Sequence, residues 1–288
     1  YRKTVSGFPR AKLCSMPFNG LRVIAFESRR SAEIAELIRR QQGEPFTAPA
    51  IREEMLEDHQ EAFDFAERLF RGEFDMVILM TGVGIRGLEK IVGSKYGEGR
   101  LPQALRKITI VARGPKPAAV LREMQVPVTV QVPEPNTWRE LLQVIEGRPE
   151  RKIALQEYGR SNDDLIAALR ERGAQVTPMR IYLYQLPEDT APLIEAARRI
   201  AQGEADILLF TTSVQAVHLV DIAAEENIET RMRSKLREMV IASIGPTTSE
   251  TLEEIGIAVD LEPSHPKMGF LVKETADRAA EILARKRV

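Results

Sequence analysis

The stretch GEADILLFTTSVQAVHL, residues 203–219, decides the fold class of this chain. It contains the apolar run 207–210, then the hydroxyl residues 211–213, and then apolar residues at roughly helical spacing. This order predicts a strand, a tight turn and a helix. The hydroxyls fall where a helix N-cap belongs, and Ser213 is the favoured cap. In α/β proteins, ligands bind beyond the carboxyl ends of such strands.

A closely similar stretch lies 131 residues earlier in the chain. Residues 72–88 read GEFDMVILMTGVGIRGL, so Gly72 matches Gly203 (203 minus 72 is 131). The same offset carries the Gly-Pro pair at 114–115 onto the pair at 245–246, and an offset of 130 relates the segments upstream. Turn residues that stay in phase over most of each half indicate an internal duplication. Two copies are too few for a solenoid, so we expect two similar domains that face each other.

The rest of the chain alternates short apolar runs with amphipathic stretches. This alternation predicts parallel sheets covered by helices on both faces. A glycine-rich loop is expected at 93–99. Residues 45–51 are extended but contain two prolines, which favours a linker over a central strand. Residues 176–181 form a second extended piece.

Length and composition are those of an ordinary globular protein. The 288 residues suffice for two domains of about 130 residues each. The longest apolar runs are far shorter than the roughly 20 residues that span a bilayer, and no leader-like segment opens the sequence. A net charge of −1 without a basic run disfavours nucleic-acid binding. The single cysteine, Cys14, fits a reducing compartment. We therefore expect a cytoplasmic protein without a membrane or nucleic-acid partner.

Four strand-to-helix turns are candidate sites for an anionic ligand. Such turns present unpaired backbone N–H groups and the positive end of a helix dipole. The alternative is that their small residues only form the turn and cap the helix. This alternative prevails for any one turn, but four turns paired across two domains make the two interpretations about equal. The candidates in these turns are Thr81, Gly82, Val83, Gly84, Arg113, Gly114, Lys116, Thr212, Ser213, Gly245, Thr247 and Thr248.

Other chemical signatures are weak or absent in the sequence. No phosphate-binding Gly-x-x-x-x-Gly-Lys-Ser/Thr occurs, and the turn at 81–84 lacks the third glycine of a dinucleotide site. His59, His218 and His265 have no partner at metal-ligand spacing, so no metal site is expected. No arrangement of residues suggests a covalent nucleophile.

Tyr182 and Tyr184 are two residues apart on a predicted strand. Residues at this spacing share one face of the strand, so both hydroxyls point to the same side. The usual interpretation is a pair of half-buried strand tyrosines. The functional alternative is a phenol that acts as a proton donor.

With these motifs the sequence resembles the uroporphyrinogen-III synthase family over residues 20–285. In the second half the resemblance is carried by LLFTTSVQAV, by ASIGPTTSETLEEIGIAV and by ALQEYGRSNDDLIAALRERGAQV with the tyrosine that follows it. In the first half it is carried by MTGVGIRGL and ARGPKPAAVLREMQVP. These motifs are short, but their order and spacing along the whole chain make the match fairly specific.

The resemblance implies two flavodoxin-like α/β domains joined by a two-stranded ribbon. One domain would be discontinuous (1–47 plus 182–288), the other would comprise 50–178, and the linkers would lie at about 45–51 and 176–182. The implied reaction is closure of hydroxymethylbilane, a linear tetrapyrrole, to uroporphyrinogen III, with loss of water and inversion of the last pyrrole ring. The resemblance further implies a monomer without a cofactor.

The resemblance also assigns roles to individual residues. The family's strand tyrosine falls on Tyr182, with Tyr184 as the alternate catalytic residue. The Thr-Ser turn falls on 212–213, and the other turn motifs fall on the candidates above. Val214 stands where a proline often follows, and Gly82 stands where a serine is common. Both departures favour backbone N–H groups as the ligand's donors. The substrate-binding set is completed by Tyr158, Arg160 and Lys267.

A function of a different class remains open. Two similar α/β domains with a hinge also describe a small-molecule binding or effector-sensing module. That alternative predicts tight, reversible binding without turnover.

Overall fold

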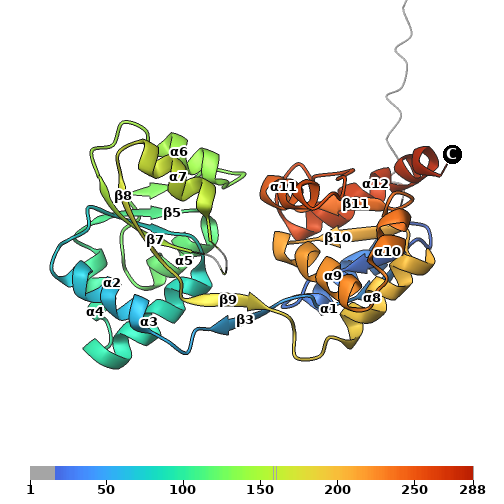
Figure 1. The fold of residues 1–288 in the computed structure, drawn as a ribbon. Coiled ribbons are helices and arrows are strands. Elements are labelled where there is room, and N and C mark those ends of the chain that lie inside the picture. Colours follow the sequence, from blue (N-terminus) through green and yellow to red (C-terminus); the bar gives the residue numbers. More distant parts are fainter. Residues whose placement is uncertain (1–16, 158, 160, 288) are drawn as a thin grey trace, which may run out of the picture.

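The apolar run 207–210 forms a central strand of a four-stranded parallel sheet. The computed structural model describes residues 17–157, 159 and 161–287. The strand order of this sheet is β11-β10-β1-β2, and all its pairings are parallel. Its strands are β1 (Arg22–Ala25), β2 (Glu44–Thr47), β10 (Ile207–Phe210) and β11 (Val240–Ser243). With the helices that cover it, this sheet forms the first unit (Figure 1).

The middle of the chain forms a second parallel sheet, of five strands, with the order β6-β5-β4-β7-β8. Its strands are β4 (Met76–Leu79), β5 (Thr109–Ala112), β6 (Val130–Gln131), β7 (Lys152–Gln156) and β8 (Gln175–Met179). This sheet and its helices form the second unit (Figure 1). The α/β class with parallel sheets is therefore confirmed.

The two sheets share one strand order. Strands β11, β10, β1 and β2 correspond in sequence and in position to β5, β4, β7 and β8. The fifth strand of the second sheet, β6, has a counterpart in an isolated bridge between Ala242 and Leu261. These two residues lie 131 positions after Val111 and Val130, which pair β5 with β6. The offset that relates the two halves of the sequence thus also relates equivalent strands of the two sheets.

Helices cover both faces of each sheet, as expected from strands without polar alternation. Side chains of β4 illustrate this, because Val77 and Leu79 enter one core while Met76 and Ile78 enter another. The second unit carries α2 (Gln60–Phe70), α3 (Gly82–Tyr96), α4 (Arg100–Leu105), α5 (Pro115–Glu123), α6 (Trp138–Val144) and α7 (Asp163–Glu171). The first unit carries α1 (Ser31–Arg40), α8 (Ala191–Gln202), α9 (Ser213–Glu225), α10 (Glu229–Leu236), α11 (Pro246–Glu254) and α12 (Met268–Lys286). Among the helices of the described residues, none is long and apolar enough to cross a membrane.

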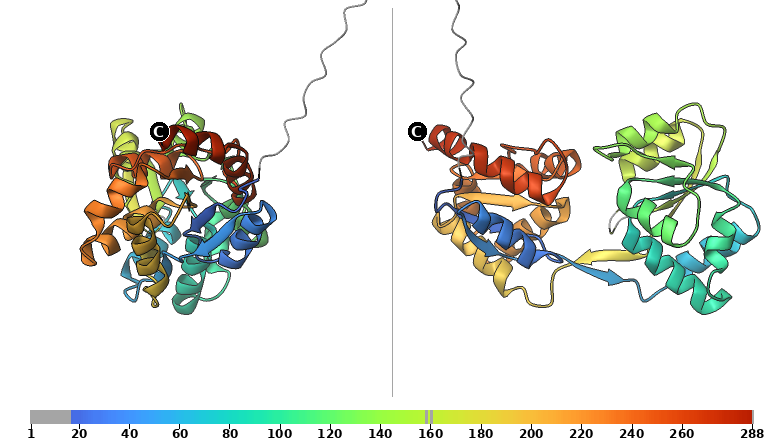
Figure 2. Two further views of the ribbon diagram at one scale, coloured as in Figure 1. Left: turned by 90° about the vertical axis from the view of Figure 1, so that its right-hand side faces the viewer. Right: turned by 180° about the vertical axis from the view of Figure 1, so that it is seen from behind.

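An antiparallel ribbon of two strands connects the units. Strands β3 (Arg52–Met55) and β9 (Tyr182–Gln185) pair with Met55 opposite Tyr182. The view from behind in Figure 2 shows the chain crossing between the units along these two strands.

The two linkers predicted at 45–51 and 176–182 are partly wrong, because each range begins within an edge strand of a sheet. Residues 44–47 form the edge strand β2, and residues 175–179 form the edge strand β8. Pro45 and Pro178 are tolerated there because an edge strand is paired on one side only. The ribbon therefore lies later in both crossings than the prolines suggested.

The predicted loop at 93–99 is also partly wrong. Helix α3 continues through Gly93 and ends at Tyr96. Ile91 and Val92 of this helix are buried in the core of the second unit, and Tyr96 packs against that core. This packing outweighs the low helix propensity of glycine.

Candidate active site

The candidate turns follow parallel strands, so they gather at one edge of each sheet. Contacts between the units show that these two edges face each other. Arg139, at the start of α6, forms an ion pair with Glu250 of α11 in the other unit. Arg29, in the turn after β1, forms an ion pair with Glu53 of the ribbon, which pairs with Tyr184. The helix starts of both units therefore border a common space.

The turn after β4 is held by two polar side chains. Thr81 is the N-cap of α3, and its hydroxyl accepts a hydrogen bond from the Gly84 N–H at 3.1 Å. Gln156, the last residue of β7, is fully buried, and its Oε1 accepts from the N–H groups of Met80 at 3.1 Å and Thr81 at 3.2 Å. Its Nε2 donates to the Glu157 carbonyl at 2.6 Å and to Thr81 Oγ1 at 3.3 Å.

The ribbon brings the two candidate tyrosines to this turn. The hydroxyl oxygens of Tyr182 and Thr81 are 3.2 Å apart and hydrogen-bonded, and the Tyr182 side chain is only 1% exposed. The ring of half-buried Tyr184 lies edge-on to that of Tyr182, with centroids 5.5 Å apart. Burial, followed by the charge and hydrogen bond of Tyr182, raises the pKa of Tyr184, and Arg29 and Arg113 oppose the shift only in part. The Tyr184 phenol therefore keeps its proton over the physiological range.

The equivalent turn after β10 has a different construction. Gln215 of α9 reaches back, and its Oε1 accepts from the N–H groups of Thr211 at 2.8 Å and Thr212 at 3.2 Å. Thr212 is the N-cap, with extended backbone angles. The prediction of Ser213 as the cap is wrong, because the Thr-x-x-Gln spacing places the reciprocal partner three residues after Thr212. Ser213 is the first helical residue, and its side chain is buried.

The remaining two turns are Gly-Pro helix starts. Gly114 and Gly245 are the N-caps of α5 and α11, both are extended, and each is followed by a proline at the first helical position. Gly114 lies so close to Asn136 that a β-carbon would sit 2.7 Å from the Asn136 Oδ1 position. In α11 the Thr248 side chain is buried, whereas that of Thr247 is half-buried.

The cationic candidates differ in how firmly they are held. Arg113 is half-buried, and its Nε donates to the Asn136 carbonyl at 2.9 Å. Lys116, in the first turn of α5, and Lys267, the N-cap of α12, are exposed. Two members of the predicted set, Tyr158 and Arg160, lie outside the described residues.

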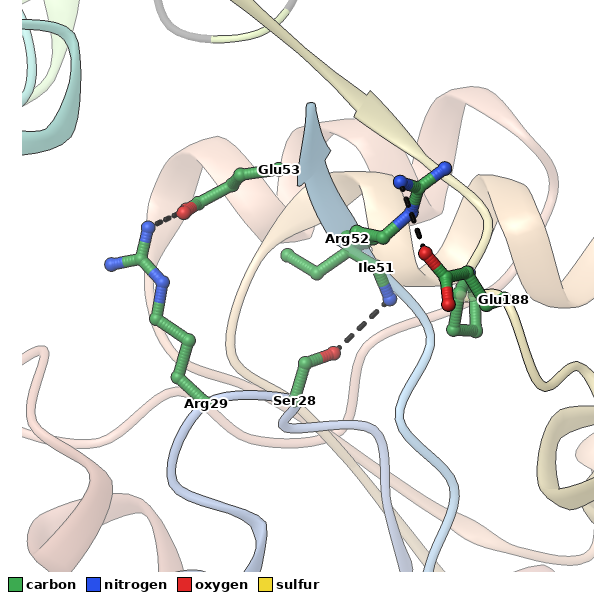
Figure 3. A pocket seen from close by; sticks show the side chains of 7 residues that line it. Ser28, Arg29, Ile51, Arg52, Glu53 and Glu188 are labelled. Atoms are coloured by element: carbon green, nitrogen blue, oxygen red, sulfur yellow. Dashed lines mark hydrogen bonds and ion pairs between the residues drawn. The ribbon is translucent and has the colours of Figure 1, made fainter. Parts of the chain in front are cut away.

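A cation that the sequence analysis missed is Arg29. It follows β1 at the same sheet edge and forms an ion pair with Glu53 of the ribbon. Its position in the turn between the buried strand β1 and helix α1 is the signal that would have found it. Arg29 also borders a cavity of about 470 Å³ where the ribbon leaves the first unit (Figure 3). The cavity is lined by Ser28, Arg29, Ile51, Arg52, Glu53, Pro187 and Glu188.

Known proteins resemble this chain over most of its length. A family model described as uroporphyrinogen-III synthase HemD matches residues 32–273, most of the chain. The chain belongs to the uroporphyrinogen-III synthase family. The predicted resemblance is thereby confirmed.

Relatives agree with this assignment over nearly their full lengths. A mutant uroporphyrinogen III synthase from Thermus thermophilus is 27% identical, with a TM-score of 0.70 over 91% of this chain and 99% of that one. The wild-type Thermus enzyme in another crystal form is also 27% identical and has a TM-score of 0.53 over 91% of this chain and 98% of that one. A Methanothermobacter thermautotrophicus protein provisionally named uroporphyrinogen-III synthase is 32% identical over 231 residues, 79% of this chain and 87% of its own.

Within the synthase family fold, the described residues offer no preformed metal site. No group of three or more His, Cys, Asp or Glu side chains is placed to hold an ion in residues 17–157, 159 and 161–287. The polar groups at the facing sheet edges are instead backbone N–H groups, hydroxyls, amides and a few cations. Such groups suit an anionic organic ligand.

Proposed function

We propose that this chain closes hydroxymethylbilane to uroporphyrinogen III, with loss of water and inversion of the last pyrrole ring. The observation that carries the proposal is the position of Tyr182 in a chain of the synthase family. Its phenol lies at the end of the central strand β4, next to the N-cap of α3. A proton donor thus stands beside a helix start that favours anions.

The anionic substrate has to be bound by a protein of net charge −1. The bilane carries eight carboxylates, so binding depends on local donors rather than on the overall charge. The N–H groups at the helix starts are the main candidates, because the side chains of Ser213 and Thr248 are buried. Positive charge would come from Arg113, Lys116 and Lys267. Further polar contacts would come from Tyr158 and Arg160.

The chemical step is loss of the terminal hydroxyl group. The pyrrole nitrogen donates its electron pair as the C–O bond breaks, and the oxygen takes the bonding pair and a proton and leaves as water. We assign that proton to Tyr182. Tyr184 is the weaker candidate, because burial raises its pKa. Ring closure later releases a proton from carbon, which restores the phenol.

The enzyme must mainly impose a conformation, because the bilane also closes without inversion on its own. We propose that residues 1–47 with 182–288, and residues 50–178, move as two domains about the ribbon. The two Thermus crystal forms support this, since they match this chain with equal identity but TM-scores of 0.70 and 0.53. Closure of the domains would bring both sets of helix starts to one substrate.

The direct test is incubation with freshly generated hydroxymethylbilane, followed by separation of isomers I and III. We expect isomer III in excess, and isomer I alone in the control without protein. A parallel sample with a chelator tests the proposal that no metal is needed. Formation of isomer I alone, with tight bilane binding, would favour the binding or sensing module instead.

The catalytic role of Tyr182 is tested by Tyr182→Phe. We expect turnover to fall severalfold to about a hundredfold, the usual range for one general acid, with isomer III still the main product. Tyr184→Phe is the matched control, because it removes the neighbouring hydroxyl on the same strand. Full activity of Tyr182→Phe with an impaired Tyr184→Phe would transfer the role to Tyr184.

We further propose a cytoplasmic monomer that uses no cofactor and binds no nucleic acid. Support comes from the balanced charge and the single cysteine. Sedimentation of the purified protein, with and without the bilane, tests the monomeric state.

A further inference from the structure

The Gln156 side chain is buried beside the proposed active site, and the reaction described above does not use it. It is fully buried, and all of its hydrogen-bonding capacity is engaged. Its oxygen accepts from the N–H groups of Met80 and Thr81. Its two N–H bonds go to the Glu157 carbonyl and to the Thr81 hydroxyl oxygen. A carboxamide has two lone pairs on oxygen and two N–H donors, so no capacity is left over.

This arrangement weakens the hydrogen bond that the Tyr182 hydroxyl donates to Thr81. The Thr81 oxygen accepts from the Gly84 N–H at 3.1 Å and from Gln156 Nε2 at 3.3 Å. A hydroxyl oxygen has two lone pairs, and both are then occupied. The third neighbour is the Tyr182 hydroxyl, which donates to the Thr81 oxygen at 3.2 Å and competes with the other two donors for these lone pairs. A hydroxyl held this weakly can turn to a better acceptor, so the Tyr182 proton remains available for a ligand oxygen.

We propose that Gln156 is a positioning residue which, through Thr81, keeps the Tyr182 proton available for the departing hydroxyl of the substrate. This inference rests on the proposed function. When the phenol proton passes to the leaving oxygen and the C–O bond breaks, the Thr81 O–H can turn and donate to the phenolate oxygen. Without the Gln156 amide, one lone pair of Thr81 is free, and the Tyr182 hydroxyl donates to it without competition.

The packing shows that the position of Gln156 is tightly defined. A β-carbon on Gly84 would lie 2.0 Å from Gln156 Nε2, so the amide occupies the space that a side chain at position 84 would take. In the first unit the residue 131 positions after Gly84 is Gln215, and its own side chain accepts from the equivalent N–H pair of Thr211 and Thr212. Both units therefore satisfy the same two backbone donors.

The two glutamines differ in where the amide N–H points. Gln215 Nε2 donates to Thr211 Oγ1 at 2.9 Å, one residue before the N-cap. Gln156 Nε2 donates to the hydroxyl of the N-cap itself, which is the hydroxyl that contacts Tyr182. Capping of the turn thus accounts for Gln215 completely, whereas Gln156 also acts on a tyrosine. Gln215 is the matched control.

The test is a double-mutant cycle that combines Gln156→Leu with Tyr182→Phe, measured as kcat and KM for hydroxymethylbilane. We expect Gln156→Leu to lower kcat by at least about fivefold and to change KM by less than about threefold. Adding Gln156→Leu to Tyr182→Phe should lower kcat by less than about twofold more, because the proton transfer that Gln156 supports is already lost. The control Gln215→Leu should instead combine with Tyr182→Phe as the product of the two single effects.

Several outcomes would overturn the proposal. If Gln156→Leu and Tyr182→Phe lower kcat multiplicatively, Gln156 acts only on stability, and the proposed function is untouched. If Tyr182→Phe is fully active while wild-type protein makes isomer III, the proposal fails together with the role of Tyr182. If Gln156→Leu does not fold, the same cycle is run with Thr81→Val, with Thr81→Ser expected to restore most of kcat. Multiplicative losses for Thr81→Val would also overturn the proposal.

Discussion

Glycines at single positions determine which side chains can approach the helix starts. Gly84 is helical and has no left-handed backbone angle, so its role is the space it leaves. That space holds the Gln156 amide, whereas the equivalent position in the first unit is Gln215. Two exchanges between the halves, Gly84 for Gln215 and Gln156 for Phe26, thus move the source of the turn's acceptor from the helix itself to a neighbouring strand.

We expect Gly84→Ala to destabilise the protein, although alanine is the better helix former. The new β-carbon would lie 2.0 Å from Gln156 Nε2, and overpacking of this kind costs about 1–3 kcal/mol. Gly93→Ala is the control in the same helix, because its β-carbon would meet nothing closer than 3.7 Å. That change should stabilise by up to about 1 kcal/mol. Denaturant unfolding measures both, and equal effects would contradict the packing argument.

At the scale of single elements, each strand–turn–helix segment separates two tasks. Its carboxyl-terminal edge carries the helix-start N–H groups that we propose bind the substrate, and its amino-terminal edge carries an aspartate that accepts hydrogen bonds. Asp206, just before β10, accepts from the backbone N–H of Arg22 and from the guanidinium groups of Arg22 and Arg287. Asp75, 131 residues earlier, accepts only from backbone N–H groups in the described structure, those of residues 151 and 152.

At the ligand edge, we expect Thr247→Trp to raise the KM for the bilane about tenfold. Thr247 is half-buried in the first turn of α11, and a bulky ring there would block N–H groups whose loss is worth about 1–2 kcal/mol. Thr247→Ala leaves those groups open and should change KM by less than about threefold. Lys116→Ala probes the equivalent position of the second unit. Equal losses from Ala and Trp would show that the hydroxyl, not the backbone, binds the substrate.

At the opposite edge, we expect Asp206→Asn to remove an acid-dependent part of the stability. Burial alone would raise the pKa of Asp206, but the hydrogen bonds from Arg22 and Arg287 outweigh it and lower the pKa to about 2. Because the folded-state pKa is below the ordinary value of 3.8, this stabilisation is complete above about pH 4 and is lost as the pH falls towards 2. Thermal unfolding between pH 7 and 2 measures it. Asp75→Asn, at an exposed site, should have a smaller effect, and parallel curves for wild type and Asp206→Asn would contradict the assignment.

At the scale of the whole molecule, a ribbon and an ion pair connect the units within the described residues. One is the ribbon of β3 and β9. The other is the ion pair of Arg139 in α6 and Glu250 in α11, two helices that lie on the side of the molecule away from the ribbon (Figure 1). Both side chains are partly exposed, at 55% and 38%, so the pair contributes at most about 1 kcal/mol. A contact of this strength shifts the equilibrium towards the arrangement in which the two units are close together, but it is too weak to prevent them from separating.

We expect Arg139→Glu and Glu250→Arg each to raise the KM for the bilane by up to about fivefold, the factor that about 1 kcal/mol represents. The exchanged pair, with both changes, should restore KM at low salt. In 1 M salt, where screening acts within about 3 Å, the differences should largely disappear. Identical KM values for all four proteins would show that the ion pair plays no part in domain approach.

The sequence by itself determined the parallel α/β class, the strand–turn–helix segments and the residues at the facing sheet edges. Each of these follows from local patterns: apolar runs buried on both faces, hydroxyl and Gly-Pro helix starts, and a repeat that keeps its phase. Only the tertiary structure placed β2 and β8 at sheet edges and shifted the ribbon to 52–55 and 182–185. It alone brought Tyr182 to Thr81, 101 residues away, and Gln156 to the same hydroxyl. These contacts depend on which distant segments pair, and a local pattern carries no record of that pairing.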